Sequence, residues 1–228
     1  MKLKVISTGS TGNSYILTNN QNQHLIIDAG LPIGEIKKGL DYDLEHVVGA
    51  VISHSHKDHC LSVPKLKNMG IPCYEPYKDR LQYMKTKLGN FSITSFPVPH
   101  HGTENRGFLI TSDNTVFCYL TDLEYLPYDL SSKGINILLI ELNYQKDRVD
   151  ESTHLEHTVL GHLEQDTAID IMAHYKDTLR KVILCHMSQS GALNRELAMK
   201  KIREAIPDYI EVDFAKPNTE YNLNECPF

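Results

Sequence analysis

The most informative stretch of this sequence is Ser53-His54-Ser55-His56-Lys57-Asp58-His59, which directly follows the apolar run Val47 to Ile52. An apolar run of this length is typical of a buried β-strand, so the histidines and the aspartate lie in the turn at its end. Imidazole and carboxylate groups are the ligands that zinc and similar divalent ions bind in proteins. The stretch therefore predicts a metal site at a strand end, and with it a metal-dependent hydrolase.

The bulk composition is that of an ordinary globular protein. The chain has 228 residues, of which 41% are hydrophobic and 23% are charged, and we expect residues 1–228 to form one domain. No apolar run approaches the length needed to cross a bilayer, and the apolar part of Met1 to Ile6 is too short for a signal peptide. We therefore expect no membrane partner.

Cysteine usage and net charge narrow the setting further. The five cysteines are scattered, odd in number and lack a C-x-x-C pair, which favours reduced thiols in the cytoplasm. The formal net charge of -6 argues against a protein that neutralises many phosphates of a long duplex. Because a metal pair supplies its own positive charge, a nucleotide or a single-stranded nucleic acid remains a suitable substrate.

Strands and helices alternate along the chain without a repeat. The pattern predicts helices from Pro32, after His59, over 164–175 and over 194–206. We expect residues 143–161 to form a long loop or a short helical insert, and the tail from Lys216 to be loose. Strands are predicted at 3–7, 15–18, 25–27, 47–53, 71–75, 91–98, 106–112, 115–121, 135–142, 181–185 and 209–214. This order favours two sheets covered by helices on their outer faces.

The histidine-rich stretch is too crowded for a single ion, so two adjacent metals are the natural interpretation. His54 and His56 alternate along an extended segment and point the same way, while Asp58 and His59 follow in the turn. Further ligands stand at the ends of other predicted strands, namely His100 or His101, Asp122 and His186. Asp28 also ends a strand, where it either orients a ligating imidazole or forms a turn before Ala29-Gly30.

Together these residues resemble the metallo-β-lactamase superfamily over essentially the whole chain. The segments most similar to its WalJ (YycJ) branch of nucleases are Ser7 to Ser14, Ile27-Asp28-Ala29-Gly30-Leu31, Val98-Pro99-His100, Leu120-Thr121-Asp122, Ile140-Glu141-Leu142-Asn143, Gly161-His162-Leu163 and His186-Met187-Ser188. The resemblance implies an α+β fold, a four-layer αββα sandwich, with two Zn²⁺ ions or, alternatively, Mn²⁺. It assigns His54, His56, His100 and Asp122 to one ion, and Asp58, His59, Asp122 and His186 to the other. The spacing of the WalJ pattern selects His100, and that of tRNase Z-like members would select His101.

A carboxylate and a histidine outside the metal set indicate which bond is broken. Glu141 ends an apolar strand, where a charge needs a partner, and His162 precedes a helix. In tRNase Z-like phosphodiesterases a strand-borne Glu orients a His in this position, and that His assists the leaving oxygen. The resemblance therefore implies Asp58, Glu141 and His162 as the catalytic residues. The alternative is a structural ion pair between Glu141 and His162.

The chain departs from the WalJ pattern after Glu141. That branch usually has Glu-Ala-Asn-His-Asp, whereas this chain has Glu141-Leu142-Asn143-Tyr144-Gln145. Tyr144 either stacks on a base or fills space. The insert 143–161, with His154 and His157, is expected to be a lid or a dimer contact, so a homodimer is one expected assembly. Asn13 and Ser188 are predicted to contact substrate phosphate, with turn formation as the alternative.

The sequence thus predicts a dinuclear phosphodiesterase acting on nucleic acid or a nucleotide. A cyclic-nucleotide phosphodiesterase, of the type that phages use against cyclic-nucleotide defence signalling, is the alternative within this class. A glyoxalase II-like thioesterase leaves Glu141 and His162 without a role. A binding module with a structural metal fits less well, because structural zinc sites are closed.

Overall fold

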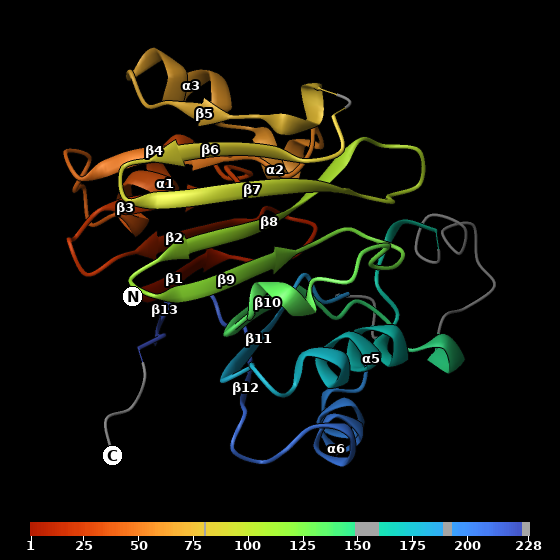
Figure 1. Cartoon of the computed structure of the whole chain (residues 1–228). Helices are drawn as coiled ribbons and strands as arrows, with labels where there is room; N and C mark the ends of the chain where they lie inside the picture. Colours follow the sequence, from red (N-terminus) through yellow and green to blue (C-terminus); the bar gives the residue numbers. More distant parts are fainter. Residues whose placement is uncertain (80, 149–159, 189–192, 225–228) are drawn as a thin grey trace.

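The computed structural model describes residues 1–79, 81–148, 160–188 and 193–224. It contains two stacked mixed β-sheets with helices on both outer sides (Figure 1). The fold is therefore the four-layer αββα sandwich that the sequence predicts.

The first sheet has the strand order β13-β1-β2-β3-β4-β5. Its strands are β1 (Lys2–Ser7), β2 (Ser14–Thr18), β3 (His24–Ile27), β4 (Val47–Val51), β5 (Cys73–Tyr74) and β13 (Thr219–Asn222). The second sheet has the order β12-β11-β10-β9-β8-β7-β6. Its strands are β6 (Met84–Leu88), β7 (Phe91–Val98), β8 (Asn105–Ser112), β9 (Thr115–Leu120), β10 (Ile137–Glu141), β11 (Lys181–Cys185) and β12 (Glu211–Phe214).

The helices are short on one side of the sandwich and longer on the other. They are α1 (Ile33–Gly39), α2 (Lys57–Cys60), α3 (Val63–Asn68), α5 (Gln165–Tyr175) and α6 (Arg195–Ala205), with 3-10 turns η1 (Pro76–Lys78), η2 (Ser131–Lys133) and η3 (Lys146–Arg148). The two longer helices begin at side-chain caps: Glu164 accepts from the amides of Asp166 and Thr167, and Asn194 from those of Glu196 and Leu197. Within the described part of the chain, no helix has the length and apolarity to cross a membrane.

Three clusters of buried apolar side chains fill the spaces between the four layers. Between the sheets, side chains such as Leu17 and Ile27 of the first sheet pack against Phe108 and Leu139 of the second. The outer face of the second sheet packs against α5 and α6, and that of the first against α1 and α3. Each fully buried aliphatic or aromatic side chain contributes about 1.5–3 kcal/mol, so the apolar alternation of the strands stabilises all four layers.

The strand directions bring several chain segments to one edge of the sandwich. Strands β9, β10 and β11 are parallel neighbours, so their carboxyl ends meet at one edge. Glu141 is the last residue of β10, and Asp122 and His186 follow β9 and β11. In the first sheet β3 and β4 are also parallel, which places Asp28 beside the stretch that begins at Ser53. The polar residues of the predicted site therefore converge at strand ends.

Three predictions about elements need correction. The chain from Lys216 is not loose throughout, because β13 pairs with β1 in antiparallel register; only Tyr221 of this strand is buried, so the apolar signal is weak. Strand β6 was not predicted, because Lys85 and Lys87 alternate with partly buried side chains on a sheet edge. The single helix expected after His59 is two short helices, α2 and α3.

Candidate metal centre

The loop that carries the histidines is held by two neighbouring loops. The backbone amide of Asn13 donates to the Asp58 carbonyl at 2.7 Å, and that of Ala29 donates to the His59 carbonyl at 2.7 Å. Gly30 allows this close approach, because a Cβ at this position would lie 1.6 Å from the Asp58 carbonyl oxygen. The glycine that follows Asp28-Ala29 is thus a packing requirement of the metal loop.

Three histidines form the first group of candidate ligands. His54 Nε2 lies 3.0 Å from His56 Nδ1, and His100 Nε2 lies 3.2 Å from the same His56 atom. The Nδ1–H of His100 donates to the Gly161 carbonyl at 2.6 Å, which directs its Nε2 toward the other two rings. Of the two histidines that the sequence left open, the structure brings His100 into the group, whereas His101 is exposed.

The second group combines histidines and carboxylates. His59 Nε2 lies 3.0 Å from Asp122 Oδ2 and 3.6 Å from Asp58 Oδ2. His186 Nε2 lies 3.9 Å from the same Asp58 oxygen. Asp122 is also within reach of His54, so its carboxylate stands between the two groups. The structure therefore brings together all seven residues predicted as ligands.

Asp28 takes the orienting position, which was one of its two predicted roles. The Nδ1–H of His59 donates to Asp28 Oδ2 at 2.7 Å, so Nε2 is the atom of His59 that faces the ligand cluster. The carboxylate also accepts from the Ser53 amide at 2.7 Å and from the Ser53 hydroxyl at 2.9 Å. A carboxylate behind a ligating imidazole fixes its tautomer and its orientation.

Three of these residues hold strained backbone conformations. Asp28, Asp122 and His186 have φ values of 55°, 50° and 48°; Asp28 and His186 directly follow a strand, and Asp122 follows β9 after one intervening residue. Non-glycine residues in this left-handed region cost about 1–3 kcal/mol each and often mark functional sites. The strain turns each side chain from the strand direction toward the cluster.

Glu141 and His162 lie at the edge of the second group. The Nδ1–H of His162 donates to Glu141 Oε1 at 2.7 Å, and the same nitrogen is 3.2 Å from Asp122 Oδ1. Glu141 is fully buried and also accepts from His186 Nδ1 at 3.0 Å and from the Asn143 side chain at 3.0 Å. The partner that an apolar strand end requires for Glu141 is therefore present.

The carboxylates make the cluster favourable to positive charge. Burial alone lowers the pKa of His59, but Asp122 and Asp28 outweigh it and raise this pKa to about 10. Burial likewise lowers the pKa of His162, and Glu141 and Asp122 raise it to about 9. Burial raises the pKa of Asp122, yet His186 and His59 hold it well below its ordinary value. Such a field also attracts divalent cations.

The donor atoms fit a pair of metal ions. Two nitrogens bound about 2.0–2.1 Å from a tetrahedral ion lie about 3.3 Å apart, close to the 3.0 and 3.2 Å between the first-group nitrogens. His186 Nε2 is buried and has no hydrogen-bond partner among the described residues, although buried polar atoms almost always have one. A metal ion bound between this nitrogen and Asp58 would give it the partner that it lacks.

The three residues predicted to contact substrate, Asn13, Tyr144 and Ser188, lie in different environments. Asn13 is buried; its side chain exchanges hydrogen bonds with Gly9 and its Nδ2 lies 3.0 Å from His59 Nε2, so it shapes the turn beside a candidate ligand. Tyr144 is only 4% exposed, which favours space filling over base stacking. Ser188 is half-buried near Asn143, and its phosphate contact remains a prediction. His154 and His157, and with them the proposed lid or dimer contact, lie outside the described residues.

Sequence reasoning missed several polar residues that support the site. Asn105 donates to the carbonyls of Thr121 and Asp122, and Asn143 donates to the His186 carbonyl at 2.9 Å. Thr8 accepts from the backbone amide of His186 at 2.8 Å. Asn143 lies in a quoted motif and could have been singled out, but Asn105 begins a strand and Thr8 follows one, and polar residues are ordinary at both kinds of position.

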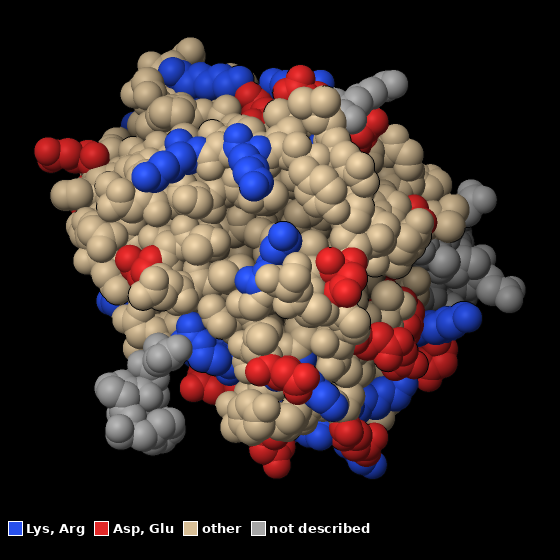
Figure 2. Space-filling view, viewed as in Figure 1, with Lys and Arg blue, Asp and Glu red and all other residues tan. Residues whose placement is uncertain are grey.

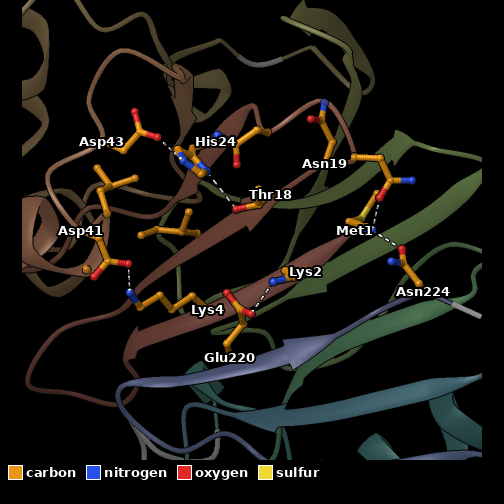
Figure 3. A pocket seen from close by; sticks show the side chains of 15 residues that line it. Met1, Lys2, Lys4, Thr18, Asn19, His24, Asp41, Asp43, Glu220 and Asn224 are labelled. Carbon is orange, nitrogen blue, oxygen red and sulfur yellow. Dashed lines mark hydrogen bonds and ion pairs between the residues drawn. The ribbon is translucent and has the colours of Figure 1, made fainter.

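A separate cavity of about 450 Å³ lies along β1 and β2 (Figure 3). Its charged side chains pair with one another: Lys2 with Glu220 at 2.9 Å and Lys4 with Asp41 at 2.8 Å. The two ring nitrogens of His24 lie 2.9 Å from the Thr18 hydroxyl and 3.5 Å from an Asp43 carboxylate oxygen. Because these charges are already paired, the cavity is a weaker candidate site than the histidine cluster.

The assignment of the third histidine can be tested with a matched pair of variants. His100→Ala is expected to weaken zinc affinity by more than about 10-fold, since loss of even an outer partner costs 10–100-fold. His101→Ala, in the adjacent exposed position, is expected to bind zinc as the wild type does. Metal content after dialysis and competition with a chromogenic chelator measure both. Equal loss in both variants would contradict the assignment.

Comparisons with known proteins agree with the fold. The sequence matches the family model of the metallo-beta-lactamase superfamily over residues 7–168. The metallo-beta-lactamase fold protein YhfI from Bacillus subtilis superposes with a TM-score of 0.76 at 19% identity, covering 96% of this chain and 98% of that one. A diphosphatase of the PhnP family gives 0.68 at 15%, covering 96% of each chain.

The human short-form tRNase Z gives a TM-score of 0.66 at 13% identity, covering 99% of this chain and all of that one. No curated protein matched the sequence. At these identities the structural likeness shows the fold alone. The family model, however, covers most of the chain, and its range contains every candidate ligand except His186. The chain belongs to the metallo-beta-lactamase superfamily.

Proposed function

We propose that the protein is a dinuclear metal-dependent phosphodiesterase that hydrolyses a nucleotide or nucleic-acid phosphodiester. The observation that carries the proposal is the pairing of His162 with the buried Glu141 at 2.7 Å, beside the shared carboxylate Asp122. A thioester has less need of a general acid, because its thiolate leaving group departs readily without protonation. An alkoxide leaving group requires one.

The division of labour follows from the contacts of each residue. Glu141 holds His162 through Nδ1, so Nε2 is the ring atom that would face a leaving oxygen and give it a proton. Asp58 is the most exposed carboxylate of the cluster, at 28% of its side chain, and would help to orient the attacking water. When bound, the ions would supply Lewis-acid polarisation of the phosphoryl oxygens and a lowered pKa for water. Zn²⁺ is the proposed metal and Mn²⁺ the alternative.

Substrate size is constrained by burial and by charge. His54, His59 and His186 are all buried, so little of the candidate ligand set is open to a bulky substrate. On the visible face, acidic and basic side chains are interspersed over α5 and α6 instead of forming one basic stripe (Figure 2). Both features favour a small or single-stranded substrate over a duplex. The similar structures include a diphosphatase and a tRNase Z, which supports phosphoester chemistry.

A cyclic mononucleotide is the second candidate substrate. The burial of the donor atoms favours it, because a compact substrate needs less room around the phosphate than a polymer does. A WalJ-like nuclease role is the first candidate and rests on the sequence motifs. A cytoplasmic location and a homodimer remain predictions.

A substrate screen tests the proposal. The purified protein, loaded with Zn²⁺ or Mn²⁺, would be incubated with cyclic mononucleotides, single-stranded DNA, single-stranded RNA and a glutathione thioester, each with and without EDTA. We expect EDTA-sensitive release of product from at least one phosphodiester and little from the thioester. Thioester hydrolysis without any phosphodiester hydrolysis would refute the proposal.

A further inference from the structure

Tyr119 makes a polar contact that the proposed chemistry does not use. Its side chain is fully buried between the sheets, and its hydroxyl donates to Asp28 Oδ2 at 2.7 Å. Burial raises the pKa of Tyr119 well above its ordinary value, so the phenol stays neutral and remains a donor. The same Asp28 oxygen receives the Nδ1–H of His59 at 2.7 Å. Tyr119 is thus connected to a candidate ligand through two hydrogen bonds that share one Asp28 oxygen.

The contact also joins the two sheets at the site. Asp28 directly follows β3 of the first sheet, and Tyr119 lies on β9 of the second, three residues before Asp122. His59 belongs to the half of the site carried by the first sheet, whereas Asp122 belongs to the other half. The Tyr119 hydroxyl therefore links the residue that orients a ligand of one sheet to the strand that precedes a ligand of the other.

The geometry of Asp28 makes the tyrosine consequential. Asp28 holds a strained φ of 55° and is fully buried, so its carboxylate cannot exchange a lost partner for bulk water. Without the Tyr119 hydroxyl, the Asp28 carboxylate would, among the described residues, accept hydrogen bonds only from the Ser53 amide, the Ser53 hydroxyl and His59. Because Ser53 Oγ also lies 3.0 Å from His54 Nδ1, a shift of Ser53 toward Asp28 would disturb a second candidate ligand.

We propose that Tyr119 is a positioning residue of the metal centre, which holds Asp28, and through it the His59 ring, at the distance from Asp122 that metal binding requires. The inference rests on the proposed function only for the presence of the metal centre. It predicts that loss of the hydroxyl weakens metal binding even where the protein remains folded, because the hydroxyl holds Asp28, and an outer partner such as Asp28 typically contributes 10–100-fold to metal affinity.

The test compares Tyr119→Phe with Tyr175→Phe. Tyr175 is also buried, and its hydroxyl accepts from the Leu130 amide at 3.1 Å, away from the histidine cluster. Zn²⁺ affinity would be measured by competition with a chelator, the geometry by the visible absorption of the Co²⁺-loaded protein, and folding by the melting temperature in EDTA. We expect Tyr119→Phe to lose 10–100-fold in Zn²⁺ affinity with an altered Co²⁺ spectrum, and Tyr175→Phe to lose stability alone.

The contrary outcomes separate this inference from the proposed function. If the wild type binds metal and Tyr119→Phe binds it equally well, or if Tyr175→Phe loses as much affinity, the positioning role is wrong. A wild type that binds no divalent ion overturns the metal centre and this inference together. Should Tyr119→Phe fail to fold, Asp28→Asn decides: asparagine tolerates the left-handed backbone, and unchanged Zn²⁺ affinity in that variant overturns the proposal.

Discussion

The variant His162→Ala is expected to lower turnover of a phosphodiester with an alkoxide leaving group by about 10²–10⁴-fold, the usual contribution of a general acid. Its metal content should stay at the wild-type level, because His162 is not among the seven candidate ligands. In this variant the buried Glu141 carboxylate still accepts hydrogen bonds from His186 and Asn143, so it keeps hydrogen-bond partners.

Two comparisons make this result specific. An ester with p-nitrophenolate as leaving group needs less protonation, so its hydrolysis should fall much less than that of the alkyl ester. The control is His46→Ala, because His46 Nδ1 also lies 2.7 Å from a carboxylate, that of Asp43, but on the exposed surface. If His162→Ala turns over both esters at the native rate, Glu141 and His162 form a structural pair and the general-acid role is wrong.

The variant Asp122→Asn is expected to lose metal as well as activity. Asparagine keeps the shape of the side chain and tolerates the φ of 50° at this position, but an amide cannot supply a shared anionic ligand. Since outer partners alone contribute 10–100-fold, metal affinity should fall by more than about 100-fold and activity with it.

Asp113→Asn provides the matched control for this change. Asp113 has a φ of 51° and accepts a hydrogen bond from the Asn20 amide, remote from the histidine cluster. Elemental analysis and calorimetric titration with Zn²⁺ would measure both variants. An Asp122→Asn protein that still binds the wild-type amount of metal with the wild-type affinity would remove Asp122 from the ligand set.

Most of the layered fold could be predicted because its signals are local. Apolar runs such as Ile137 to Ile140 mark strands buried on both faces, and the cap at Asn194 marks the start of α6. Strands β6 and β13 could not be predicted, because an edge strand exposes one face and carries polar residues there. Their identity depends on the neighbours with which they pair, which the sequence alone does not specify.

The candidate ligands could also be predicted, because each stands within two residues of a strand end or in the histidine-rich stretch. The choice between His100 and His101 needed the structure, since it depends on the hydrogen bond from His100 to Gly161. The support from Tyr119 and Thr8 could not be found in this way, because both contacts cross between sheets. The signal that was available is general: a tyrosine in a buried strand needs a partner for its hydroxyl.

The central claim, a two-metal phosphodiesterase, is tested most directly by titrating the metal-free protein with Zn²⁺ or Mn²⁺ while following hydrolysis of bis-p-nitrophenyl phosphate. The account predicts that activity rises until two equivalents of metal per chain have bound and that Asp122→Asn stays inactive throughout. Activity that is complete after one equivalent, or no phosphodiester hydrolysis at two, would contradict it.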